Sequence, residues 1–369
     1  MRIVLHIGAW KTGSSAIQHF MSVSADDLRK DGVVAPADAM DADGRNRILK
    51  RLNGSDEDAA PLLAEIAALK AAGARTLVIS NEHYWPLPVE AIQRIGARLK
   101  TVSDDINVLI YIRPQEEMWR SLHAQQAKKF QVKSGAAIWG TADYLPPVFA
   151  ERAVHYCRTM QLFADTFGQS AISVRLYDRA RFAGGDVVTD FLSHLGLDGT
   201  AFKREERDIN RSVGWKGVAF AIWLADEALG PMQALNPGRP LGKLYIRSVK
   251  RTAEMFGDDD WIGRAAEPLT TAEKAAIRQH YADDNRRLFQ TYFGGEDIFP
   301  QIRPGRGDPL SPEAIPAQEM IFAKRRVQKL ADRLGYATTG AEYLFAPPPA
   351  QPRGVKRLLN ALPFRAQKT

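Results

Sequence analysis

Short apolar runs alternate with longer helical patterns along most of the chain. Runs of this length, bounded by turn residues, predict buried strands. The expected strands lie at 2–8, 32–35, 76–82, 106–112 and 172–178. Between and after them, apolar residues recur at helical spacing, which predicts helices over 14–29, 57–72, 88–99, 114–130, 147–167, 186–195, 215–229 and 270–293. Strands alternating with helices predict an α/β fold of three layers, with a mainly parallel central sheet flanked by helices.

Loop and tail signals interrupt this pattern. Residues 131–147 and 231–262 contain several prolines, and we expect both to be loops with insertions. Their aromatic residues, Trp139, Tyr144 and Trp261, either stack on an acceptor or anchor the loops to the core. The chain is therefore expected to comprise a domain over 1–300, a linker over 301–312, a helical extension over 313–346 with a basic helix at 313–334, and a basic, flexible tail over 347–369.

The first strand runs into a loop that is suited to anions. Two glycines, one lysine and three hydroxyl residues lie between Ile7 and the start of the next helical pattern. Backbone N–H groups and the positive end of a helix dipole converge at such a loop. Lys11 adds a charge, and Ser14 and Ser15 can donate to phosphate oxygens. The loop is no Walker A motif, because Ser14 stands where that motif has its lysine.

A second phosphate signal follows the strand at 106–112. Arg113 comes directly after the strand, and Ser121 lies eight positions later, about two helical turns on. Arginine offers a planar, bidentate donor to phosphate, and serine adds a hydroxyl from the helix. Pro114 suits a first helical position, where no N–H is needed.

These segments, in this order, resemble the nucleotide-binding segments of PAPS-dependent sulfotransferases. Lys11-Thr12-Gly13-Ser14-Ser15 is similar to the phosphosulfate-binding loop, with Trp10 where the family usually has proline. The strand that ends Ser80-Asn81-Glu82 resembles the Ser-x-Glu strand of bacterial carbohydrate-type members. The resemblance covers about residues 1–300.

The resemblance implies a P-loop-like fold and an enzyme. PAPS (3′-phosphoadenosine 5′-phosphosulfate) would give its sulfuryl group to a hydroxyl or amine, most of all on a carbohydrate or glycolipid, and leave 3′,5′-adenosine bisphosphate. A lipid or a small secondary metabolite stays open as acceptor. The implied roles are as follows: Lys11 at the bridging oxygen; Thr12, Gly13, Ser14 and Ser15 at the 5′-phosphate; Arg113 and Ser121 at the 3′-phosphate; and Arg211 and Ser212 in a late basic loop over the nucleotide. No metal is expected.

The resemblance also points to a general base. Glu82 is the first candidate, because related carbohydrate enzymes use a glutamate at this strand end. His83 is the second, although neighbouring strand residues point to opposite faces. Glu116 and His123, on the helix after Arg113, stay open. His6 lies within the first strand, where a satisfied core histidine is the commoner role.

Composition narrows the setting. The chain has 369 residues, 45% of them apolar and 25% charged, as in globular proteins. A net charge of +7 favours anionic ligands, and no nucleic-acid motif accompanies it, so no nucleic-acid partner is expected. The single cysteine, Cys157, is expected to serve packing. The sequence has no signal peptide or long apolar run, which favours a cytoplasmic location, with peripheral contact to the inner membrane face through the basic tail.

Two other classes stay open at this point. One is a P-loop-type kinase that uses ATP; against it, no Walker B aspartate ends an apolar strand. The other is a non-catalytic nucleotide-binding or glycan-binding relative, which would be expected to lack Lys11 or the base.

Overall fold

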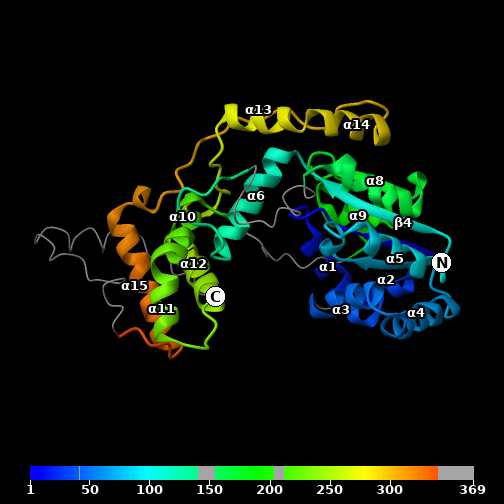
Figure 1. The fold of residues 1–369 in the computed structure, drawn as a ribbon, viewed down its shortest axis with the longest axis horizontal. Coiled ribbons are helices and arrows are strands. Elements are labelled where there is room, and N and C mark those ends of the chain that lie inside the picture. Colours follow the sequence, from blue (N-terminus) through cyan, green and yellow to red (C-terminus); the bar gives the residue numbers. More distant parts are fainter. Residues whose placement is uncertain (41, 140–153, 203–211, 340–369) are drawn as a thin grey trace, which may run out of the picture. The chain divides into compact units, whose positions relative to one another are not determined.

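The computed structural model describes residues 1–40, 42–139, 154–202 and 212–339 (Figure 1). Two compact units divide the chain. The first comprises 1–125, 136–210 and 267–307, and the second comprises 126–135, 211–266 and the segment from 308 onward. Residues 126–135 and 211–266 thus belong to the second unit, although they fall inside the expected 1–300 segment. The expected linker, extension and tail stay predictions, and the tail lies outside the described residues.

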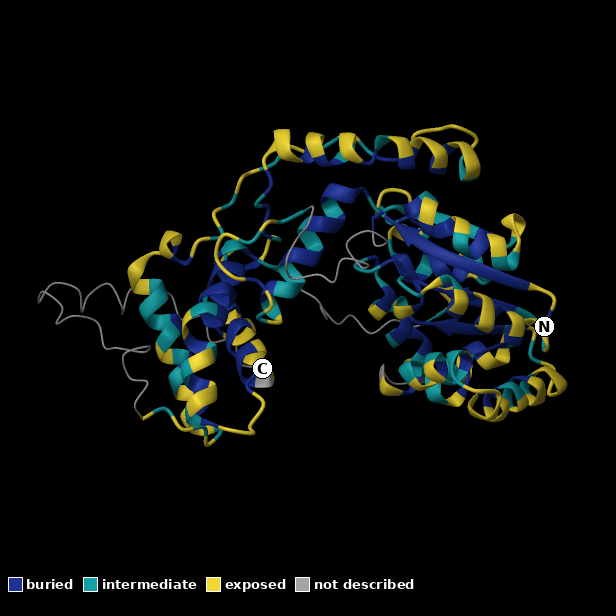
Figure 2. Cartoon of the chain, in the orientation of Figure 1, coloured by how far each residue is buried: buried dark blue, intermediate teal, exposed yellow. Residues whose placement is uncertain are grey.

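The first unit is built on a parallel sheet of five strands, which confirms the α/β fold. Its strands run in the order β2-β3-β1-β4-β5. Each lies at an expected apolar run: β1 (Arg2–His6), β2 (Val33–Val34), β3 (Thr76–Ser80), β4 (Ile106–Ile112) and β5 (Ile172–Leu176). All seven residues of β4 are buried. The inner strands β1, β3 and β4 are almost wholly buried, whereas the edge strand β5 is half-buried at Ser173, Val174 and Arg175 (Figure 2). Burial on both faces explains why the strands read as continuous apolar runs.

Helices flank this sheet. One apolar cluster joins strand residues such as Val4 and Leu109 to three helices, α1 (Ser14–Val23), α2 (Ala25–Lys30) and α9 (Val187–His194). Alternate strand residues, among them Val108 and Ile110, point to the opposite face and are fully buried too. The other helices of this unit are α3 (Ala42–Asn53), α4 (Asp56–Ala71), α5 (Val89–Lys100), α6 (Gln115–Lys128, which runs on into the second unit), α8 (Tyr156–Phe167), α13 (Thr271–His280) and α14 (Ala282–Tyr292).

The second unit is mainly helical. Its elements are β6 (Ser212–Val213), α10 (Trp215–Trp223), a π-helical turn (Leu224–Ala228), α11 (Leu229–Leu235), α12 (Gly242–Phe256), β7 (Ile262–Gly263) and α15 (Ala317–Arg333). An apolar core joins α10, α12 and α15, and it includes Trp261, which is fully buried. This tryptophan therefore anchors the core and is not an exposed stacking surface.

The expectation of a loop over 231–262 is wrong, because two helices occupy most of it. Pro231 lies three residues after the π-helical turn in a continuous helical run, and Pro237 and Pro240 lie between α11 and α12. Buried residues of α12 recur at helical spacing from Leu244 to Ala253. The helix α3 was also missed, since its sequence is dominated by polar residues. No helix in the described part of the chain is long and apolar enough to cross a membrane.

Candidate functional site

Lys11, Glu82 and Arg113 follow three adjacent strands, β1, β3 and β4, at the carboxyl-terminal edge of the sheet. Strand β1 lies between β3 and β4, with His6 opposite both Ser80 and Leu109. The pairing continues past the strand ends: the Asn81 N–H donates to the His6 carbonyl oxygen (3.0 Å), and the Ala9 N–H donates to that of Tyr111 (2.9 Å). The loop after β1 therefore starts between the residues that follow β3 and β4.

The loop backbone leaves little room for side chains. Gly8 has a φ of +108°, and a Cβ atom there would lie 3.3 Å from the Glu82 Cβ atom. Gly13 has a φ of +83° and forms the N-cap of α1, so no side chain caps that helix. The Thr12 hydroxyl donates to the Ala9 carbonyl oxygen (2.6 Å) and braces the loop from inside. An uncapped helix N-terminus presents N–H donors to an anion.

The serines of this turn differ in exposure. Ser14 is buried, whereas Ser15 is exposed to solvent. Ser14 and Gln18 are one helical turn apart, and both are buried. The first turn of α1 therefore carries one hydroxyl on its inner face and one on its solvent side.

Arg113 joins the end of β4 to this loop. Its Nη1 donates to the Lys11 carbonyl oxygen (3.1 Å), and its Nη2 pairs with Glu117 Oε2 (3.2 Å). The guanidinium carbon lies 5.7 Å from the centre of the Tyr177 ring. The Nε atom is buried and has no hydrogen-bond acceptor among the described residues. Burial lowers the pKa of Arg113, yet a guanidinium stays charged in proteins.

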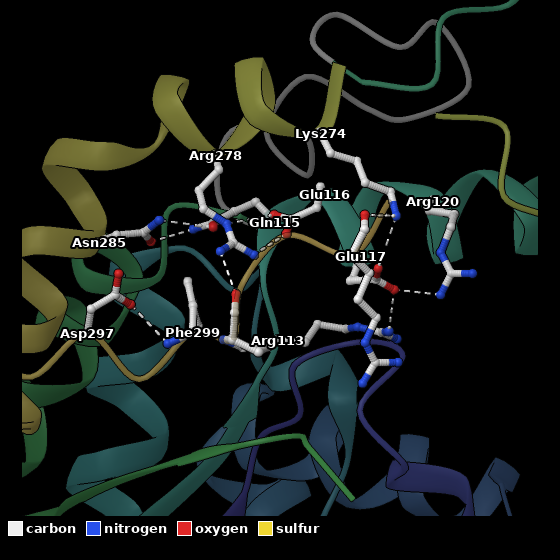
Figure 3. Close-up of polar contacts among 12 residues, drawn as sticks. Arg113, Gln115, Glu116, Glu117, Arg120, Lys274, Arg278, Asn285, Asp297 and Phe299 are labelled. Atoms are coloured by element: carbon white, nitrogen blue, oxygen red, sulfur yellow. Dashed lines mark hydrogen bonds and ion pairs between the residues drawn. The ribbon is translucent and has the colours of Figure 1, made fainter. Parts of the chain in front are cut away.

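Glu117 is the centre of a charged cluster (Figure 3). It accepts from Arg120 Nη2 (2.6 Å), and its other oxygen lies 3.7 Å from Lys274 Nζ. Lys274 in turn pairs with Glu267 (2.9 Å). The described part of this cluster comprises three cations, Arg113, Arg120 and Lys274, and two carboxylates, Glu117 and Glu267. Burial raises the pKa of Glu117, but Arg120, Arg113 and Lys274 outweigh it and hold that pKa below its usual value.

The neighbouring residues of α6 bind the late helices. Glu116 pairs with Arg278 of α13, and Gln115 exchanges hydrogen bonds with Asn285 of α14 (2.6 and 3.1 Å). The Glu116 carboxylate therefore links α6 to α13 through its ion pair with Arg278. Burial lowers the pKa of His123 to about 4.

Glu82 begins a short 3-10 turn after β3 (Glu82–Tyr84), beside Gly8. Its Oε2 accepts from Gln18 Nε2 (2.9 Å). Burial raises the pKa of Glu82, but hydrogen bonds from its own backbone and from Gln18 prevail and hold that pKa below its ordinary value. The carboxylate is therefore charged at neutral pH. His83 is exposed, and its N–H donates to Asn81 Oδ1 (2.9 Å).

Hydrogen bonds connect the Glu82 carboxylate to the buried His6 through Gln18 and Ser80. His6 Nδ1 lies 2.8 Å from Ser80 Oγ, which also lies 3.4 Å from Gln18 Nε2. Burial lowers the pKa of His6 to about 4, so the ring is neutral at pH 7. These bonds form a chain from the core to Glu82, and Gln18 is its last link. Nothing in the sequence pattern pointed to Gln18.

Ser121 and Ser212, two further predicted residues, lie on α6 and in β6. Ser121 is half-buried on α6. Ser212 lies in β6 of the second unit, paired with Gly263, and its nucleotide role stays a prediction. Arg211 lies outside the described residues, as does Tyr144. Lys216, a neighbour in sequence, is held by Glu319 (3.0 Å) within the second unit's core. Within the described ranges, no three His, Cys, Asp or Glu side chains gather as metal ligands would.

Comparison with known proteins yields distant similarities. No protein-family model matches the chain. An uncharacterized protein of Archaeoglobus fulgidus is 22% identical over 224 residues, which is 60% of this chain and 55% of that protein. The chain thus matches little more than half of that relative. The crystal structure of a sulfotransferase from Alicyclobacillus acidocaldarius matches with a TM-score of 0.34 and 15% identity, over 56% of this chain and 87% of that one. A TM-score this low has no bearing on function.

The crowding at Gly13 gives a first prediction. In Gly13→Ala, the new Cβ would lie 2.9 Å from both Tyr177 Cε2 and Val187 Cγ1, on top of the strain of a positive φ. Gly73→Ala is the matched control, because Gly73 has a φ of +90° and no atom near its Cβ position. We expect Gly73→Ala to cost about 1–2 kcal/mol of unfolding free energy. Gly13→Ala should cost about 1–3 kcal/mol more. Urea denaturation measures both, and equal losses would contradict the crowding.

The link between Gln18 and Glu82 gives a second prediction. Gln18→Leu removes a donor to the charged carboxylate, so the pKa of Glu82 should rise. Carboxyl NMR titration measures it, with Glu82→Gln to assign the resonance and Gln161→Leu, on exposed α8 surface, as control. Because the Glu82 pKa is depressed on folding, its stabilisation is present above the ordinary carboxyl range and is lost as pH falls. An unchanged Glu82 pKa in Gln18→Leu would refute the assignment.

Proposed function

We propose that this chain is a PAPS-dependent sulfotransferase that acts on a hydroxyl or amine, most of all of a carbohydrate or glycolipid. One observation carries the proposal: the Arg113 guanidinium donates to the carbonyl oxygen of Lys11. Two segments that are each suited to a phosphate, far apart in the sequence, are thereby joined at one edge of a parallel sheet. Ligands of open α/β sheets bind at this edge.

The residues present fit a donor with two separate phosphate groups. The uncapped N-terminus of α1, with Lys11, Ser14 and Ser15, suits the 5′-phosphosulfate. Arg113 suits the 3′-phosphate, because its buried Nε has no acceptor among the described residues. A phosphate at this point would satisfy the Nε donor through a charge-assisted hydrogen bond.

The protein's own part in the reaction is positioning and electrostatics. When bound, PAPS supplies an activated sulfuryl group. Lys11 and the N–H groups of the loop would balance negative charge on the phosphate side. Glu82, charged at neutral pH and oriented by Gln18, would accept the proton of the acceptor hydroxyl. Sulfuryl transfer would need no covalent intermediate with the protein, so positioning and charge stabilisation would be its main contributions.

Binding of 3′,5′-adenosine bisphosphate tests the donor site. We expect wild type to bind it with a dissociation constant on the order of micromolar. Arg113→Ala should weaken binding about 10- to 100-fold, because two or more charge-assisted hydrogen bonds are lost. Calorimetric titration measures both, with AMP as ligand control and Arg94→Ala as an exposed arginine of the same unit. Equal binding of AMP by all three proteins would overturn the proposal, and stabilisation by Mg-ATP alone would favour a kinase.

The role of Glu82 is tested by separating binding from transfer. Glu82→Gln keeps the shape and the hydrogen bond to the site but cannot take a proton. We expect bisphosphate affinity within about twofold of wild type, and transfer slowed about 10²- to 10⁴-fold. Sulfur-labelled PAPS with a panel of glycans and glycolipids measures transfer. Undiminished transfer in Glu82→Gln, with loss in His83→Ala, would move the base to His83.

A further inference from the structure

A groove in the second unit is lined with cations from two helices. Arg251 of α12 and Arg326, Lys329 and Arg333 of α15 line it. All but the half-buried Arg326 are exposed. None of the four pairs with a carboxylate in the described part of the chain, whereas Lys250, next to Arg251, pairs with Glu254 (3.8 Å). The positive charge of this groove is therefore not balanced by the described residues.

The residues that line the groove include a buried hydroxyl with no hydrogen-bond partner in the described part of the chain. Ser248, Thr252 and Leu330 line it and are buried. The Ser248 hydroxyl donates to the Leu244 carbonyl oxygen (2.8 Å), so its proton is used within α12. Thr252 is fully buried, and its Oγ1 has no hydrogen-bond partner among the residues that the structure describes. A buried hydroxyl in this state is costly unless a ligand satisfies it.

We propose that this groove binds a phosphate or sulfate group. Its charged lining consists of donors alone, three guanidinium groups and one ammonium, and the Thr252 hydroxyl adds a donor at the floor. Guanidinium forks match the spacing of oxygens on a tetrahedral oxyanion and bind them bidentately. The groove lies wholly in the second unit and shares no residue with the loop after β1. The inference therefore stands apart from the proposed transfer reaction.

The test compares two charge-matched double variants of the full chain. Arg251→Gln/Arg326→Gln removes one groove cation from each helix. Arg247→Gln/Arg325→Gln removes one exposed arginine from each of the same helices outside the groove. Inorganic phosphate, titrated at constant ionic strength, is the first probe. Vesicles of phosphatidylcholine with and without phosphatidylglycerol are the second, and they distinguish a lipid headgroup from a free phosphate. The loop after β1 is the same in wild type and in both double variants. Any phosphate bound there contributes equally to all three and does not affect the difference between them.

We expect the groove variant to lose at least about tenfold in affinity for phosphate or for the anionic vesicles, and the control variant to stay within about twofold of wild type. Thr252→Val adds a second readout. It removes an unpartnered hydroxyl, so the stability of the free protein should not fall, while phosphate affinity should drop severalfold. Equal losses in the two double variants, or absence of saturable, groove-dependent binding of both probes, would overturn the proposal.

Discussion

The parallel register of β1 between β3 and β4 is the constraint on which the rest of the site depends. Because β1 is central, the residues after it have a neighbouring strand end on either side, and hydrogen bonds continue the pairing beyond the regular strands. Gly8 thus lies against Glu82, and the Lys11 carbonyl oxygen comes within reach of Arg113. A slip of one residue would turn alternate side chains to the opposite face and separate these groups.

The buried guanidinium of Arg113 is a second constraint on the site. Its charge must be compensated, yet full compensation by one carboxylate would leave nothing for a ligand. Glu117 resolves this conflict because Arg113 shares it with Arg120 and Lys274, so its single negative charge is divided among three cations. The guanidinium is held in place while its Nε stays without an acceptor in the described structure. Buried groups with perturbed pKa values, such as Arg113 and Glu117, are typical of functional sites.

The strands and the loop after β1 could be predicted from the sequence because each is encoded by a short continuous segment. Buried parallel strands are apolar throughout, so five short runs located them, and parallel strand ends share an edge, so Lys11, Glu82 and Arg113 could be assigned to one place. The partners that tune these groups could not be predicted. Lys274 and Glu267 come from a segment more than a hundred residues further on, and their spacing carries no signal. The helix α12 was missed for a different reason: nearby prolines suggested a loop, although they lie outside its bounds.

Helix α1 couples the two halves of the proposed site. Its N-terminus faces the loop with uncapped N–H groups, and one turn later Gln18 donates to Glu82. Residues four apart lie on the same face of a helix, so Ser14 and Gln18 point to the same side and are both buried. The N–H groups of the proposed phosphosulfate site and the donor that orients Glu82 therefore belong to one helix, about 6 Å apart along its axis. A shift of α1 moves both together, which makes the packing of α1 against α9 and the sheet a condition for any chemistry at this edge.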